Sequence, residues 1–175
     1  WRITKDHWSE ADEKGFSDFV RAIGESDCNT SQSCVRGKAN PYHGTDPRNF
    51  DIDADCAKWP YFLRAYYASK NGLPFTYVNG ISGNGDERFG GTNHATSRHD
   101  ITDHGGGINA SPIILQVMAT VFSGTYRTEA AEKSGVHSDF YSPKIQPGSI
   151  RPGTAIYDVN GHVGIFSKVD SDGRI

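Results

Sequence analysis

The sequence lacks a block of basic residues and a long apolar run. Of its 175 residues, 18 are Lys or Arg and 21 are Asp or Glu, so the formal net charge is only −3. Binding to a phosphate backbone requires a basic patch, so we expect no nucleic acid partner. The longest apolar stretch, Pro112 to Phe122, is interrupted by Gln116 and is too short to cross a bilayer. We therefore expect no transmembrane segment.

Cysteine is scarce, and its number is odd. Cys28 and Cys34 lie close together in a polar segment, where a disulfide would close a small loop and leave Cys56 unpaired. One structural bridge with one free thiol is typical of an exported protein, which predicts a periplasmic or secreted location. Three reduced cysteines in a cytosolic protein are the alternative, because two loop cysteines need not pair. A zinc site at Cys28 and Cys34 would need two further ligands, and the local sequence offers none.

The length and composition predict one globular domain spanning residues 1–175. A chain of this length can bury one core and is too short to expect two. Hydrophobic residues make up 35% of it and aromatic residues 11%, while 20 Gly and 8 Pro predict many turns and long loops.

Cys56 lies where a polar loop gives way to a helical pattern. The pattern consists of aromatic and aliphatic residues at helical spacing, namely Trp59, Leu63 and Tyr66. Pro60 fits only in the first turn of a helix, which places the helix start close to Cys56. A helix N-terminus stabilises a thiolate, so Cys56 is a candidate nucleophile. The alternative is an ordinary buried cysteine that acts as a small hydrophobe.

His162 opens a strand near the end of the sequence. Apolar runs separated by Asn-Gly and Asp-Gly turns predict an antiparallel meander with strands over 155–157 and 162–169 and a third that begins at Arg174. An imidazole that meets the thiol would lower its pKa and act as its base. Taken alone, His162 is better explained as a hydrogen-bonded surface residue than as a base.

The rest of the chain predicts two more helices and a long loop. One helix starts at a capping-box-like Ser9 and ends at Gly24, and the other is capped by Ser111 and runs to Phe122. A short helical turn is possible over 128–133. Residues 79–109 have neither helical nor strand periodicity and are predicted to be a Gly-rich loop.

One histidine-rich group and one acidic group contain residue types that bind metals, but we predict no metal at either. The first group has ligand types at a spacing that fits neither a helix face nor a known short motif: His94, His99, Asp100, Asp103 and His104. The second, residues 51–55, mimics the start of a calcium loop, but Cys56 stands where such a loop needs Gly.

Two groups of residues together resemble the NlpC family of cell-wall cysteine peptidases. The run Tyr42-His43-Gly44-Thr45-Asp46-Pro47, followed by Asp55-Cys56 and an aromatic helix, resembles the N-terminal half of that family. The run Pro152-Gly153-Thr154-Ala155-Ile156-Tyr157-Asp158, followed by Gly161-His162-Val163-Gly164-Ile165-Phe166, resembles its C-terminal half. Their order along the chain agrees, and they cover roughly a third of it.

The resemblance implies an α+β, papain-like fold in which helices pack against a C-terminal antiparallel β-sheet. Cys56 would be the nucleophile at a helix N-terminus and His162 the base on the sheet. Tyr42 would correspond to the family's active-site tyrosine, and Asp55 to the acidic residue before the nucleophile. The oxyanion would be bound by the Cys56 N–H with the Tyr42 hydroxyl. No cofactor or metal is implied, and the implied substrate is a peptidoglycan stem peptide.

The chain departs from the family pattern in three places. Ala57 and Lys58 replace the usual Ser and Gly after the nucleophile, which leaves the substrate preference open. The separation of Cys56 and His162 is longer than usual, so residues 79–135 resemble an inserted loop and helix. The third catalytic residue of the family follows the histidine strand, and we expect it and the end of the fold beyond Ile175.

We therefore expect an exported cysteine hydrolase that cleaves amide bonds in cell-wall stem peptides by acyl transfer. Two alternatives stay open. One is a catalytically inactive binding or structural module of the same fold. The other is a Cys-His amidase or acyltransferase that acts on a substrate other than peptidoglycan.

Overall fold

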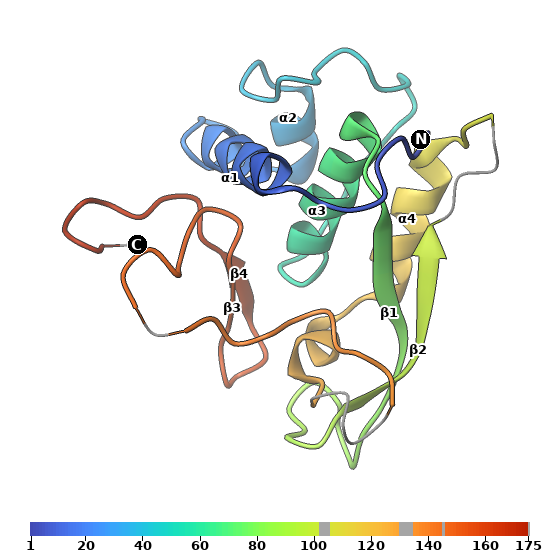
Figure 1. The fold of residues 1–175 in the computed structure, drawn as a ribbon, viewed down its shortest axis with the longest axis vertical. Helices are drawn as coiled ribbons and strands as arrows, with labels where there is room; N and C mark the ends of the chain where they lie inside the picture. The colour runs from blue at the N-terminus through green and yellow to red at the C-terminus, as the bar shows by residue number, and fades with distance from the viewer. Residues whose placement is uncertain (102–105, 130–134, 145, 175) are drawn as a thin grey trace.

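A computed structural model describes residues 1–101, 106–129, 135–144 and 146–174. The described residues form helices and two small antiparallel sheets, which confirms the α+β class (Figure 1). The elements are, in chain order, α1 (Glu10–Gly24), α2 (Ser31–Arg36), α3 (Lys58–Asn71), β1 (Phe75–Ser82), β2 (His94–Ile101), α4 (Ala110–Thr120), the 3₁₀ helix η1 (Ser123–Arg127), β3 (Ala155–Tyr157) and β4 (Val163–Ile165).

The helix α1 forms as its local sequence predicts. The Ser9 hydroxyl accepts a hydrogen bond from the Asp12 N–H, and the Asp12 carboxylate accepts one from the Ser9 N–H, so both halves of the capping box are present. Hydrogen bonds from Lys5 and then from Ser9 lower the pKa of Asp12 to about 2. The apolar stripe is buried as expected, at Phe16, Phe19, Val20 and Ile23.

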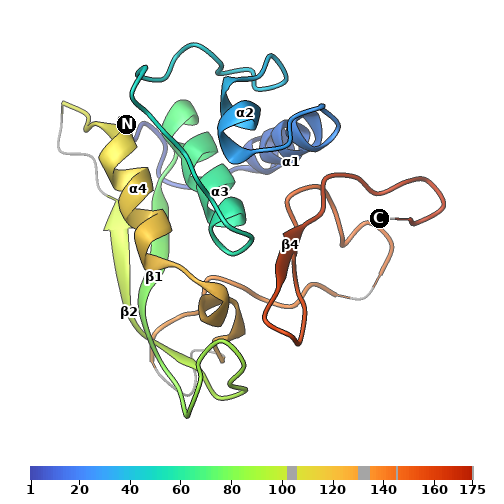
Figure 2. The ribbon, with the colours of Figure 1, turned by 180° about the vertical axis from the view of Figure 1, so that it is seen from behind.

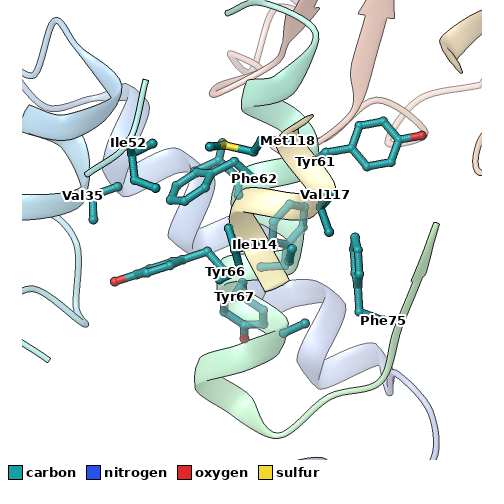
Figure 3. Packing of buried hydrophobic residues seen from close by; sticks show 14 of the residues in the cluster. Val35, Ile52, Tyr61, Phe62, Tyr66, Tyr67, Phe75, Ile114, Val117 and Met118 are labelled. Carbon is teal, nitrogen blue, oxygen red and sulfur yellow. The ribbon is translucent and has the colours of Figure 1, made fainter. Parts of the chain in front are cut away.

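The helix α3 lies at the centre of the core. Phe62, Leu63 and Tyr66 are almost completely buried, and side chains from α2, α4 and β1 surround them (Figure 3). The helix ends at Asn71, and its C-cap, Gly72, has a φ of 65°, a conformation that costs glycine little. Because each large apolar side chain contributes about 1.5–3 kcal/mol when buried, this packing fixes α3 firmly in place.

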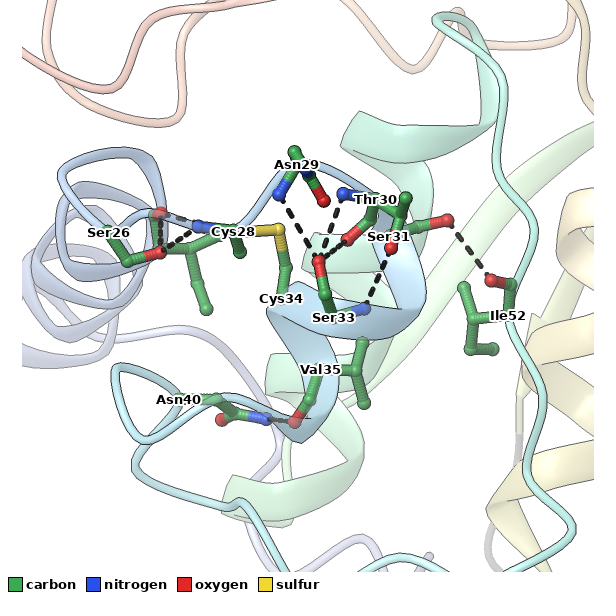
Figure 4. The surroundings of a disulfide bond; sticks show 11 residues. Ser26, Cys28, Asn29, Thr30, Ser31, Ser33, Cys34, Val35, Asn40 and Ile52 are labelled. Carbon is green, nitrogen blue, oxygen red and sulfur yellow. Dashed lines mark hydrogen bonds between the residues drawn. A yellow bond between two sulfur atoms is a disulfide. The ribbon is translucent and has the colours of Figure 1, made fainter.

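The predicted disulfide is present. Cys28 and Cys34 are bonded, with their Cα atoms 5.0 Å apart, and the bridge joins the segment after α1 to α2 (Figure 4). Beside it, Thr30 and Ser33 form the capping box of α2. Cys56 is the free cysteine, as the spacing predicts.

The prediction of a loop over residues 79–109 was wrong, because all of β2 and the end of β1 lie within it. These two strands pair antiparallel, from Phe75 opposite Ile101 to Ser82 opposite His94, with irregular register around Gly80. The strand β2 is largely polar, and only two of its residues are buried, Ala95 and Ile101. Apolar and polar residues therefore alternate little along β2, and its pairing with β1 accounts for most of its extended conformation.

The helix α4 starts and ends slightly earlier than predicted. Its N-cap is Asn109, whose side chain accepts a hydrogen bond from the Ser111 N–H, so Ser111 is not the cap. The helix ends at Thr120 and packs against α3 and β1. Of the turn predicted over 128–133, residues 130–133 lie outside the described part, and Thr128 is the C-cap of η1.

The C-terminal sheet is a short hairpin. Ala155 pairs with Ile165 and Tyr157 with Val163, so β4 covers only part of the predicted strand. The turn over residues 170–173 is confirmed, since the Gly173 N–H donates to the Asp170 carbonyl. The strands β1 and β2 pair along their length, and α4 packs against α3 and β1 (Figure 2), so the predicted packing of the helices on a C-terminal sheet is not the main one.

No helix in the described ranges is long and apolar enough to span a membrane.

Candidate active site

Cys56 lies immediately before the first turn of α3, where the sequence predicts it. The helix begins at Lys58, and Pro60 occupies its first turn. The thiol is half-buried and free. Within the described residues, neither the Cys56 Sγ nor its backbone N–H takes part in a hydrogen bond. A thiol and an amide donor are thus both available at this helix end.

Asp55 caps this helix. Its Oδ1 accepts hydrogen bonds of 3.0 Å from the backbone N–H groups of Ala57 and Lys58, and its Oδ2 lies 3.1 Å from the Lys58 ammonium. Partial burial acts to raise the pKa of Asp55, but the hydrogen bonds from Lys58 and Ala57 outweigh it, and the pKa is below its usual value. Asp55 is therefore ionised at neutral pH and occupies two of the amides at the start of α3, while the Cys56 N–H stays available.

Tyr126, which no motif in the sequence marks, contacts the same segment. Its hydroxyl donates a 2.6 Å hydrogen bond to the Ala57 carbonyl. Burial, followed by the negative charges of Cys56 and Asp55, raises the pKa of Tyr126 well above its usual value. This hydroxyl therefore keeps its proton at neutral pH and remains a donor.

Asp139 binds Tyr61, which packs against Tyr126, and no motif in the sequence marks Asp139 either. This nearly buried carboxylate accepts hydrogen bonds from the Tyr61 hydroxyl at 2.6 Å and from the Val78 N–H at 2.8 Å, and lies 2.7 Å from the Arg98 guanidinium. These partners come from α3, β1 and β2. Asp139 lies in an irregular segment, and no local pattern in the sequence marks it.

His162 lies at the edge of the C-terminal hairpin and is exposed. Side chains alternate along a strand, so His162 shares the face of Gly164, while Val163 on the opposite face is buried. A Cβ added at Gly164 would lie 3.0 Å from the Ile156 side chain, so Ile156 is on the same face of the hairpin. Because Ile156 is half-exposed, this face is open to solvent. Within the described ranges no hydrogen bond joins His162 to Cys56.

The hairpin that carries His162 docks on the loop between β1 and β2. The Tyr157 hydroxyl donates a 2.6 Å hydrogen bond to the Arg88 carbonyl, and Arg127 stacks over the Tyr157 ring. Gly161 lies against the Phe89 ring, so closely that a Cβ at this position would be 2.9 Å from it. The loop between β1 and β2, which resembles an insertion, thus positions the hairpin that carries His162.

Tyr42 does not lie beside Cys56, so its predicted place in the oxyanion hole was wrong. The Tyr42 hydroxyl accepts a 2.7 Å hydrogen bond from Asn71, the last residue of α3, and its ring packs on Phe19 and Tyr66. Cys56 precedes the first residue of the same 14-residue helix, which is roughly 20 Å long. Aromatic packing at the C-terminal end of α3 determines the position of Tyr42.

A cavity of about 510 Å³ lies in a different part of the molecule. It lies between the end of β2 and the start of α4 and is lined by His99, Asp100, Ile101, Ile108, Asn109, Pro112 and Ile113. None of the predicted site residues lines it. No group of three possible metal ligands occurs in the described ranges, and of the predicted histidine cluster, Asp103 and His104 lie outside them.

No family model, no curated protein and no solved structure matches this chain. The assignment of a function therefore depends on the residues around Cys56 and on the order of Cys56 and His162 in the chain.

Proposed function

We propose that the protein is an exported, NlpC-like cysteine hydrolase that cleaves amide bonds in cell-wall stem peptides, with Cys56 as nucleophile and His162 as base. The observation that supports this most is the position of Cys56, a free and partly exposed thiol directly before α3. The positive end of the helix dipole favours the thiolate there. The Cys28–Cys34 disulfide is consistent with export to an oxidising compartment.

The proposed reaction proceeds through a thioester. His162 takes the proton of the Cys56 thiol, and the thiolate attacks the carbonyl carbon of the substrate amide. The Cys56 N–H donates to the resulting oxyanion, and the protonated His162 gives its proton to the amine as the C–N bond breaks. Water then attacks the thioester, with His162 as its base, and the acid product leaves Cys56. The mechanism requires the His162 ring within hydrogen-bonding reach of the thiol when substrate is bound.

The test is the digestion of purified sacculi, followed by the release of soluble muropeptides. We expect Cys56→Ala to abolish release and His162→Ala to reduce it by a factor on the order of 100 to 10,000, as for loss of a general base. His99→Ala is the matched control, since His99 is an exposed histidine on β2 with no place in the mechanism. Release by Cys56→Ala at the wild-type rate would remove the proposed nucleophile.

A second candidate is a catalytically inactive binding module of the same fold. The observation that favours it is the exposed His162 ring, which no hydrogen bond within the described ranges joins to Cys56. For such a module, Cys56 would react with a thiol reagent, no muropeptide would be released, and sacculi would bind wild-type protein and Cys56→Ala equally well. Turnover that depends on Cys56 would exclude this candidate.

A further inference from the structure

The hydrogen bond from Tyr126 reaches the residue directly after the candidate nucleophile. Tyr126 lies in η1, and its hydroxyl donates to the Ala57 carbonyl at the start of α3. We propose that Tyr126 is a positioning residue that holds the Ala57 carbonyl and thereby favours the thiolate of Cys56. This inference rests on the proposed function only for its effect on catalysis, because the state of the thiol can be measured without a substrate.

A packed aromatic cluster keeps the Tyr126 hydroxyl in place. The Tyr126 ring stacks on Phe140 with 4.5 Å between centroids and meets Tyr61 edge to face at 5.5 Å. Tyr61 in turn donates to the buried Asp139. Because three separate segments of the chain build this cluster, the hydroxyl has little freedom to leave the Ala57 carbonyl.

The electrostatic effect has a definite sign. A carbonyl oxygen carries partial negative charge, and with one donor fewer it would disfavour a second negative charge nearby more strongly. The Tyr126 hydroxyl offsets that partial charge. Among the other charged groups of this region, Asp55 is paired with Lys58, and Asp139 with Arg98. Burial is the main cause of the raised pKa of Tyr126, so the hydroxyl keeps its proton and remains a donor to the Ala57 carbonyl.

The experiment compares two Tyr→Phe variants from the same aromatic cluster. Y126F removes the hydroxyl that donates to Ala57, whereas Y61F removes one that donates to Asp139. The rate of alkylation by iodoacetamide is measured from pH 6 to pH 10 with the disulfide intact, so that Cys56 is the reacting thiol. Circular dichroism and thermal unfolding verify that both variants fold.

We expect Y126F to raise the apparent pKa of the Cys56 thiol by about half a unit, which slows alkylation at pH 7 about threefold. Y61F should follow the wild-type profile. A Y126F profile that superimposes on the wild-type profile overturns the proposal. So does an equal change in both variants, because the effect would then come from packing of the cluster.

If Y126F does not fold, a variant that keeps the hydroxyl tests the proposal instead. Replacement of Tyr126 by 3-fluorotyrosine makes the phenol a stronger donor, so the apparent thiol pKa should fall, and an increase would contradict the proposal. Failure of the proposed function is separate: it appears as sacculus digestion that does not depend on Cys56, whatever the alkylation profiles show.

Discussion

The two ends of α3 differ sharply in how their polar groups are satisfied. At the C-terminal end, the Tyr66 hydroxyl donates to Asp46 at 2.6 Å and accepts from Asn40 at 3.0 Å, and Lys70 lies 2.6 Å from Asp46. The side chains of Asp46 and Lys70 are only 6% and 19% exposed. At the N-terminal end, Cys56 is half-buried, and no hydrogen bond within the described ranges reaches its thiol or its N–H.

The difference suggests a division of roles along one helix. Buried polar groups that are fully paired favour a single conformation and hold the preceding loop on α3. A helix fixed in this way can present an unpaired thiol and amide at its other end without losing its position. Substitutions at the C-terminal end should therefore change stability, and those at the N-terminal end should chiefly change reactivity.

The largest effect is expected for Asp46→Ala. It removes a nearly buried carboxylate that pairs with the Lys70 ammonium and accepts from the Tyr66 hydroxyl, and Lys70 keeps its hydrogen bond to Thr45. The free energy of unfolding should fall by about 3 kcal/mol. Urea denaturation measures this change. The alkylation rate of Cys56 under native conditions is the control and should stay at the wild-type value. A large change in that rate would break the comparison between the two ends.

The disulfide lies beside the network at the C-terminal end, because α2 also supplies the carbonyl of Val35 that binds Asn40. Replacing Cys28 and Cys34 together by Ser should lower the free energy of unfolding by about 2 kcal/mol, the value expected for so short a loop. Thermal unfolding with and without a reductant measures it. Wild-type protein in reductant should behave like the double variant, and equal stability with and without reductant would contradict the expectation.

At the N-terminal end, Asp55→Ala removes the cap of α3. The cost at pH 7 should be about 1 kcal/mol, measured by urea denaturation. Because the pKa of Asp55 is lowered in the folded protein, its contribution is present at neutral pH and is lost as pH falls below about 4. The stabilities of wild type and Asp55→Ala should therefore converge in acid. Asp55→Asn is the matched control, since it keeps the accepting oxygen, and it should cost less at pH 7.

The smallest change in stability is expected for Cys56→Ser. The thiol is half-buried, and no hydrogen bond within the described ranges depends on it, so the free energy of unfolding should change by about 0.5 kcal/mol or less. Thermal unfolding measures this, and sacculus digestion by the same sample should be lost. A large destabilisation would show that Cys56 serves the core rather than the reaction.

Local signals in the sequence predicted α1, α3 and α4, but not the short helix α2. The capping box of Ser9 and Asp12 predicted the start of α1, the apolar spacing predicted its buried face, and Pro60 predicted the start of α3 close to Cys56. These signals act between residues a few positions apart. The disulfide was predicted from the short spacing of Cys28 and Cys34 in the same way.

Interactions between distant segments were not predictable from the same patterns. The strand β2 is polar and depends on its pairing with β1. Tyr126 in η1 and Asp139 in an irregular segment contact the start of α3, and no local pattern in the sequence marks either contact. The aromatic groups at the far end of α3 place Tyr42 there, although the motif around it suggested otherwise. Such positions depend on tertiary packing, which no local period encodes.

The carboxylate of Asp139 also determines how the molecule should respond to a protease. Lys144 is exposed in an irregular stretch, which makes it a suitable place for trypsin to cut. The fragment before the cut keeps residues 135–144 in place through Asp139, while the fragment after it keeps the contacts of Arg151 with Glu13 and of Tyr157 with Arg88. A nick at Lys144 should therefore yield two pieces that travel together as one particle and separate only in denaturant.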